Sequence, residues 1–153
     1  MPIAHHAVEK GRGRLVSVGL GSCVAITIHD PMAKVGGLAH VLLPEAARGR
    51  KVENRARYAK TAVPLLLEDM RALGATGPFV AKLAGGAGLF GPMLSKSGSV
   101  GARNIAASRA ALAAARVAVV AEDVGGDRGR TVTFDVASGK LKVRSVRGGE
   151  RVL

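Results

Sequence analysis

The segment "GLGSCVAITIHD", residues 19–30, joins a glycine-flanked turn to the pattern of a β-strand. After the turn, Val24, Ile26 and Ile28 alternate with smaller or polar residues, which is the period-2 pattern of a half-buried strand. The Asp-Pro pair at 30–31 predicts where this strand ends. The only cysteine of the chain, Cys23, lies on the turn. The segment therefore predicts a strand with a thiol at its start.

Outward from this strand, the apolar patterns predict nine elements in the order β-β-β-α-β-α-β-β-β. We expect strands at about 15–20, 24–30, 38–43, 79–83, 117–123, 131–136 and 140–146, and helices at about 54–73 and 102–115. Pro64 falls inside the first helix, where proline costs about 3 kcal/mol, so a kink or a late start is expected. This order predicts an α+β fold, a layered sandwich with a mixed β-sheet and two main helices.

Length and composition bound the class of protein. The 153 residues fit a single domain over 1–153, and we expect residues 1–14 to be a flexible N-terminal arm. One cysteine cannot form an intramolecular disulfide, and no signal-peptide pattern is present. The apolar tract 105–120 is interrupted by Arg109 and Arg116, and it is shorter than the ~18 residues of a membrane span. We expect a cytoplasmic protein without membrane insertion.

The net charge of +12 favours encounter with acidic partners. Nucleic acid is one such partner and an acidic protein surface is another. Aromatic residues make up only 3% of the chain, tryptophan is absent, and no zinc-finger spacing occurs, so we do not expect a nucleic-acid partner. His5, His6 and His29 have no matching acidic or thiol cluster, so no metal site and no cofactor are expected.

A glycine-rich stretch imitates a nucleotide-binding motif. Gly86, Gly88 and Gly91 match G-x-G-x-x-G after a predicted strand. A dinucleotide site also needs an immediate helix and an acidic residue about 20 positions further on. Here a proline and a serine-rich stretch follow, and no acidic residue lies between Asp69 and Glu122. We therefore predict a turn whose backbone packs closely.

Three side chains could act together in acyl transfer. Cys23 is a candidate nucleophile, and His40 on the third strand can lower the thiol pKa or accept its proton if the two strands are neighbours. Ser17 on the first strand could present a hydroxyl to the imidazole. The backbone N–H groups of Gly21 and Ser22 could hold a developing oxyanion. Taken singly, each side chain is more often a buried structural residue, so both interpretations stay open at this point.

The same residues carry a family resemblance. "GLGSCVAITIHDP" followed by "GGLAHVLLP" closely resembles the chemoreceptor glutamine deamidases of bacterial chemotaxis, the CheD family. Further segments resemble it in order: "RYAKTAVPLLLEDMRALGA", "AKLAGGAGLF", "VGARNI" and "EDVGGDRGRTVTFDVASGKLKV". The resemblance covers about residues 15–146.

The resemblance implies a layered fold shared with bacterial toxin deamidases, and a Cys-His site. By motif position, the nucleophile falls on Cys23 and the general base and acid on His40. The family's third residue is a threonine, and Ser17 stands at that position with the hydroxyl kept and the methyl lost. The implied substrates are glutamines on methyl-accepting chemotaxis receptors. In several family members a CheC-type phosphatase binds the deamidase. A Cys-His amidohydrolase acting on another protein, or a catalytically silent binding module, remain as alternatives.

Overall fold

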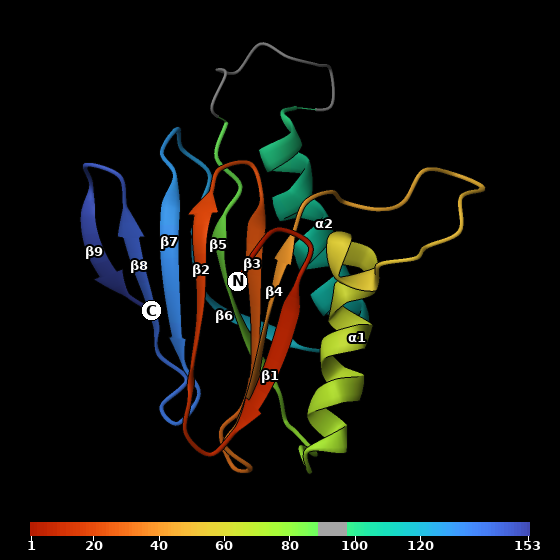
Figure 1. The fold of residues 1–153 in the computed structure, drawn as a ribbon, viewed down its shortest axis with the longest axis vertical. Coiled ribbons are helices and arrows are strands. Elements are labelled where there is room, and N and C mark those ends of the chain that lie inside the picture. Colours follow the sequence, from red (N-terminus) through yellow and green to blue (C-terminus); the bar gives the residue numbers. More distant parts are fainter. Residues whose placement is uncertain (89–97) are drawn as a thin grey trace.

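The computed structural model describes residues 1–88 and 98–153, which form three layers (Figure 1). A five-stranded sheet lies between a second sheet of four strands and a layer of two α-helices. The elements are β1 His6–Lys10, β2 Arg14–Leu20, β3 Val24–Asp30, β4 Val35–Val41, the 3₁₀ turn η1 Arg55–Arg57, α1 Ala59–Ala72, β5 Val80–Gly85, α2 Val100–Ala114, β6 Ala118–Val124, β7 Arg130–Asp135, β8 Leu141–Ser145 and β9 Gly149–Val152. The predicted α+β class with two main helices is confirmed.

The strands divide between two sheets that the sequence pattern did not separate. The five-stranded sheet has the order β1-β4-β3-β5-β6, and the second sheet has the order β2-β7-β8-β9. Of the strand pairs described for the first sheet, β5–β6 is parallel and the others are antiparallel, so the sheet is mixed, as predicted. Helix α2 connects these two parallel strands, because a parallel pair needs a crossover and cannot be joined by a tight turn.

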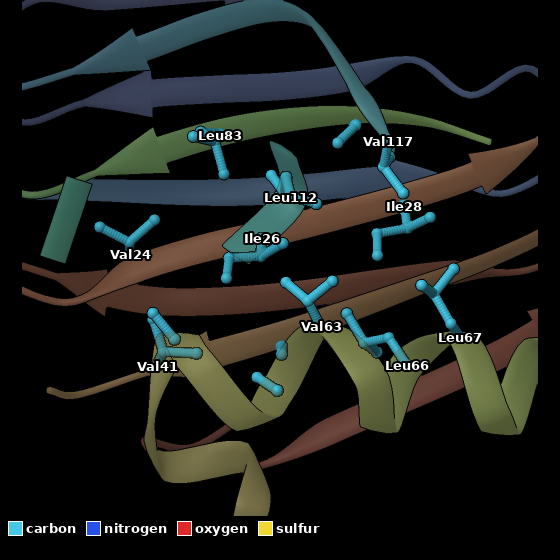
Figure 2. Close-up of a cluster of buried hydrophobic side chains, with 14 of the residues drawn as sticks. Val24, Ile26, Ile28, Val41, Val63, Leu66, Leu67, Leu83, Leu112 and Val117 are labelled. Carbon is cyan, nitrogen blue, oxygen red and sulfur yellow. The ribbon is translucent and has the colours of Figure 1, made fainter. Parts of the chain in front are cut away.

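The central strand β3 is buried along its whole length, so the prediction of a half-buried strand is wrong. Its large side chains, Val24, Ile26 and Ile28, pack against the helices with Leu66 of α1 and Leu112 of α2 (Figure 2). The smaller side chains between them face the second sheet, where Ala25 joins the other core cluster. Because both faces of β3 are covered, the alternation along the strand is between large and small side chains and not between buried and exposed ones.

The late start that Pro64 predicts is present in helix α1. Residues 55–57 form η1, capped by the side chain of Asn54, and the α-helix starts at Ala59. Pro64 still lies inside the helix, beyond its first turn, where the missing backbone N–H costs a helical hydrogen bond.

The N-terminal residues do not form the predicted arm. His6–Lys10 is strand β1, which pairs antiparallel with β4, and Arg14 already belongs to β2. Val8 packs on the helix-side core, and His6 Nε2 lies 2.8 Å from an Asp69 carboxylate oxygen. Strand pairing with a distant segment leaves no local pattern in so short a stretch, which is why the sequence analysis missed it. Within the described residues, no helix is both long and apolar enough to span a membrane.

Candidate active site

The strand register brings Cys23 and His40 to the same face of the five-stranded sheet. Ala25 of β3 pairs with His40 of β4, and the last pair of the ladder is Val24 with Val41. Cys23 precedes this last pair and is therefore a diagonal neighbour of His40, at a Cα separation of roughly 7–8 Å that side chains can bridge. Cys23 belongs to the cluster that faces the second sheet. The predicted juxtaposition of thiol and imidazole is consistent with this register.

Ser17 reaches the imidazole from the second sheet. Its hydroxyl oxygen lies 2.7 Å from Nδ1 of His40, and both side chains are fully buried. The hydroxyl also donates to the carbonyl oxygen of Met1 at 3.2 Å, and Nδ1 lies 3.4 Å from the same carbonyl. Because that carbonyl can only accept, both contacts favour a proton on Nδ1. The network therefore assigns the lone pair to Nε2.

The other ring nitrogen of His40, Nε2, is available to accept a proton. Nε2 is buried and has no hydrogen-bond partner among the residues that the structure describes. Buried polar atoms are rarely left without a partner, and those that are often have a functional role. An unprotonated Nε2 without a partner can accept a proton from a group that enters the site.

Burial sets the charge state of both groups. Burial raises the pKa of the Cys23 thiol, and its own backbone N–H offsets this only in part. Burial also lowers the pKa of His40, against the hydrogen bond to Met1, and the charges of the N-terminal ammonium and His5 lower it further. Of the two roles expected of His40, a lowering of the thiol pKa thus does not fit the free protein, because desolvation disfavours the charged forms of both groups.

The turn that carries Cys23 is held through its carbonyl groups. Gly21 accepts a hydrogen bond from the N–H of Ala87 at 2.8 Å, and Cys23 accepts one from the N–H of Gly86 at 2.8 Å. The carbonyl of Ser22 accepts a third from a side chain on α2. In the part of the chain that the structure describes, the N–H groups of Gly21 and Ser22 have no backbone partner. No hydrogen bond given for residues 1–88 and 98–153 uses these two donors, so they are candidates to bind an anionic oxygen of a ligand.

The glycine-rich stretch donates the hydrogen bonds to the carbonyls of Gly21 and Cys23, and its backbone is closely packed, as predicted. A Cβ at Gly85 would overlap the carbonyl of Cys23, and one at Gly86 would overlap the side chain of Ile105. A Cβ at Gly101 on α2 would lie 2.5 Å from the carbonyls of Gly86 and Ala87. Gly91, the third glycine of the nucleotide-like motif, lies outside the described residues.

Sequence reasoning missed one buried side chain next to the turn. Asn104 of α2 is fully buried, and its Nδ2 donates to the carbonyls of Ser22 and Leu42, both at 2.9 Å. The available signals were an isolated asparagine in an otherwise alanine-rich helix and its place in the family-like segment "VGARNI".

His29 has a different role, and His5 meets His40 through the backbone, where the His40 N–H donates to the carbonyl of His5 at 3.0 Å. His29 Nε2 bonds to the carbonyl of Val136, and its ring meets Phe134 edge-on, which is a structural role. Among residues 1–88 and 98–153, no three His, Cys, Asp or Glu side chains gather as metal ligands. A pocket of about 640 Å³ between the loop 45–52 and the start of α1 is lined by Arg48, Arg50 and Lys60 together with Glu45.

Comparison with known proteins gives the same family over nearly the whole chain. The model of the CheD family, described as CheD chemotactic sensory transduction, matches residues 42–145. The chemoreceptor glutamine deamidase CheD of Thermotoga maritima is 44% identical over 151 residues, which are 98% of this chain and 93% of that protein. A probable chemoreceptor glutamine deamidase CheD of Pyrococcus abyssi is 44% identical, over 97% of this chain and 91% of that protein. A protein of the same name from Desulforamulus reducens is 37% identical, over 99% of this chain and 92% of that protein. This chain therefore belongs to the CheD family.

Proposed function

We propose that this protein hydrolyses the side-chain amide of specific glutamines on methyl-accepting chemotaxis receptors to glutamate, with release of ammonia. The observation that carries the proposal is similarity over almost the full chain to relatives named chemoreceptor glutamine deamidase. The buried contact between Ser17 and His40, on the face that Cys23 shares, supports it with a site suited to acyl transfer.

In the first step of the proposed mechanism, Nε2 of His40 accepts the thiol proton as the sulfur of Cys23 attacks the amide carbon. A carbon–sulfur bond forms, and the carbonyl oxygen takes up the negative charge. The N–H groups of Gly21 and Ser22 are the proposed donors to this oxyanion, and one such donor is worth roughly 3–4 kcal/mol. Transfer of the proton during attack fits the neutral thiol and neutral imidazole that burial favours in the free protein.

Collapse of the intermediate then releases ammonia. His40 returns the proton to the departing nitrogen, the carbon–nitrogen bond breaks, and a thioester to Cys23 remains. His40, neutral again, accepts a proton from water, which attacks the thioester carbon. The carbon–sulfur bond breaks, the sulfur regains its proton from His40, and glutamate is released. Acid–base assistance of this kind is typically worth about 10²–10⁴-fold in rate.

Ser17 has a positioning role in this mechanism. By accepting from Nδ1–H while donating to the carbonyl of Met1, its hydroxyl holds the tautomer in which Nε2 is the base. A third group that orients the imidazole is the common arrangement of sites that use a histidine base.

The experiment that tests the proposal incubates the purified protein with a receptor cytoplasmic fragment and follows glutamine-to-glutamate conversion by mass spectrometry. We expect no conversion by Cys23→Ala and a loss of at least a hundredfold in His40→Gln. His6→Gln is the matched control, because His6 lies on the neighbouring strand β1 and bonds to Asp69. Full activity in Cys23→Ala would end the proposal.

The alternatives give different outcomes in the same assay. A Cys-His amidohydrolase with another target would convert glutamines in a different protein from a test panel and leave the receptor fragment unchanged. A silent binding module would bind the fragment without converting it. A CheC-type phosphatase is proposed as a further partner on the family resemblance alone, and co-purification with such a protein tests it. Receptor cytoplasmic helices as substrate imply that the reaction takes place in the cytoplasm.

A further inference from the structure

The backbone pairing between β3 and β4 ends at Val24, next to the candidate nucleophile Cys23. The last paired residues are Val24 and Val41. The next residue on one side is Cys23, and on the other side the chain continues into Leu42, whose N–H turns away to the carbonyl of Arg57. The carbonyls of Ser22 and Leu42 therefore lie beyond the last β3–β4 pair, and among the described residues no backbone hydrogen bond joins the two segments there.

Asn104 supplies a side-chain bridge at this point. Its amide nitrogen donates to the carbonyl of Ser22 and to that of Leu42, at 2.9 Å each. An amide nitrogen carries two protons, so each carbonyl can receive one. One side chain thus joins the turn that carries Cys23 to the strand end two residues after His40.

The position of Asn104 is itself fixed by close packing of α2. Gly101, one turn earlier, lets the helix approach the backbone of Gly86 and Ala87, and Ile105 packs over Gly86. Those two residues in turn donate to the carbonyls of the cysteine turn. The helix, the glycine-rich turn and the cysteine turn therefore form one continuous hydrogen-bonded unit.

The choice of asparagine carries a cost that packing alone does not explain. Its Oδ1 is buried and has no hydrogen-bond partner among the described residues. Leucine has a similar shape and would remove the unsatisfied Oδ1, but it would also take away the donor that Asn104 supplies to the carbonyls of Ser22 and Leu42. Locally unfavourable features such as an unsatisfied buried oxygen are expected mainly at functional sites. An amide at this position therefore indicates that the hydrogen bonds of its nitrogen have a role.

We propose that Asn104 is a positioning residue, whose amide bridges the carbonyls of Ser22 and Leu42 and so holds the thiol of Cys23 in register with the imidazole of His40. The catalytic part of this inference rests on the proposed deamidase function. Without the bridge, the turn separates from the end of β4, the thiol becomes more accessible, and proton transfer to Nε2 becomes less efficient.

The test is Asn104→Leu, compared with Ser108→Ala. Ser108 is also fully buried on α2, and among the described residues its hydroxyl bonds only to the backbone carbonyl of Asn104, so its loss perturbs the helix without removing the bridge. For Asn104→Leu we expect kcat for deamidation to fall at least tenfold with KM within twofold, while alkylation of Cys23 by iodoacetamide becomes at least fivefold faster. Ser108→Ala should stay within threefold of wild type in both measurements.

These two readouts separate positioning from stability and from the proposed function. Deamidation by Asn104→Leu within threefold of wild type, or an equal loss in Ser108→Ala at a matched melting temperature, overturns the proposal. If the wild type deamidates nothing, the alkylation rates alone decide whether Asn104 holds the turn, and unchanged alkylation overturns it. If Asn104→Leu does not fold, hydrogen exchange in the wild type decides: both Nδ2 protons must be strongly protected, and fast exchange of either overturns the proposal.

Discussion

Removing the hydroxyl at Ser17 tests the orientation of His40 with a single-atom change. In Ser17→Ala, Nδ1 loses its 2.7 Å partner and keeps only the carbonyl of Met1 at 3.4 Å, beyond the usual range of a protein hydrogen bond. Both ring nitrogens of a fully buried imidazole then lack a good partner. We therefore expect a loss of stability and a weaker preference for the tautomer with the lone pair on Nε2.

The expected magnitudes follow from the buried hydrogen bond. Leaving a buried donor unsatisfied costs about 1–3 kcal/mol, and each kcal/mol lowers the melting temperature of a domain of this size by about 2–4 °C. A neutral hydrogen bond has a net worth of about 0.5–1.5 kcal/mol, so the loss of orientation should reduce kcat by about 2- to 13-fold. This is less than the 10²–10⁴-fold expected for removing the proton-transfer group itself.

The assay combines initial rates of glutamate formation on a receptor fragment with thermal unfolding. Ser17→Thr is the rescue variant, because it keeps the hydroxyl and adds a β-branch that suits a strand, and we expect activity equal to or better than wild type. Thr27→Val is the matched stability control, since Thr27 is a buried strand residue whose hydroxyl donates to the carbonyl of Lys82.

The result that refutes the reasoning is an unchanged kcat in Ser17→Ala together with an inactive His40→Gln. That outcome would show that His40 needs no orientation by the hydroxyl. A collapse of activity in Ser17→Thr would instead show that the site is shaped for serine.

Four further predictions address the charges and buried contacts. Cys23 alkylation by iodoacetamide should keep rising as pH increases past the ordinary thiol pKa, because burial raises the pKa of this group, and a plateau near neutral pH would contradict that. Asp30→Asn should lower the free energy of unfolding by at least about 2 kcal/mol in urea titrations, because the carboxylate accepts four backbone N–H bonds and an amide nitrogen accepts none. Burial acts to raise the pKa of Asp30, but these four hydrogen bonds outweigh it and hold the pKa below its ordinary value. The stability that the carboxylate contributes is therefore complete above the ordinary pKa and is lost as pH falls through the lowered pKa. Asp30→Asn should not show this loss. Arg130→Met should cost about 1.5–3 kcal/mol in the same titration, since the partly buried Asp123 loses its 3.0 Å charged partner and keeps only Arg151 at 3.3 Å among the described residues, and a cost under about 0.5 kcal/mol would show that the pair is not structural. Association with an acidic receptor fragment should slow as salt rises, because exposed charges are screened over about 10 Å at 0.1 M and the chain carries +12, whereas a salt-independent rate would exclude steering.

Part of the site could be predicted from local pattern. The turn at Cys23 and the strand after it follow from a glycine-flanked segment and an apolar alternation, and His40 lies in a second such run. A hydroxyl contact from Ser17 to His40 was predicted as a possibility, and the two groups lie 2.7 Å apart. The predicted lowering of the thiol pKa is wrong for the free protein, because the desolvation that raises the pKa of Cys23 and lowers that of His40 depends on what covers each group.

The remainder depends on segments that are distant in the chain. No periodicity places β2 in a second sheet, pairs β1 with β4, or directs Asn104 from α2 to the carbonyls of Ser22 and Leu42. The sequence by itself determined both α-helices, seven of the nine strands that the structure describes, the α+β class and the identity of the reactive groups, because side-chain periodicity and residue chemistry are local properties. Only the tertiary structure decided which face each strand presents, which atoms meet and how far water is excluded from them, because these depend on long-range pairing and burial.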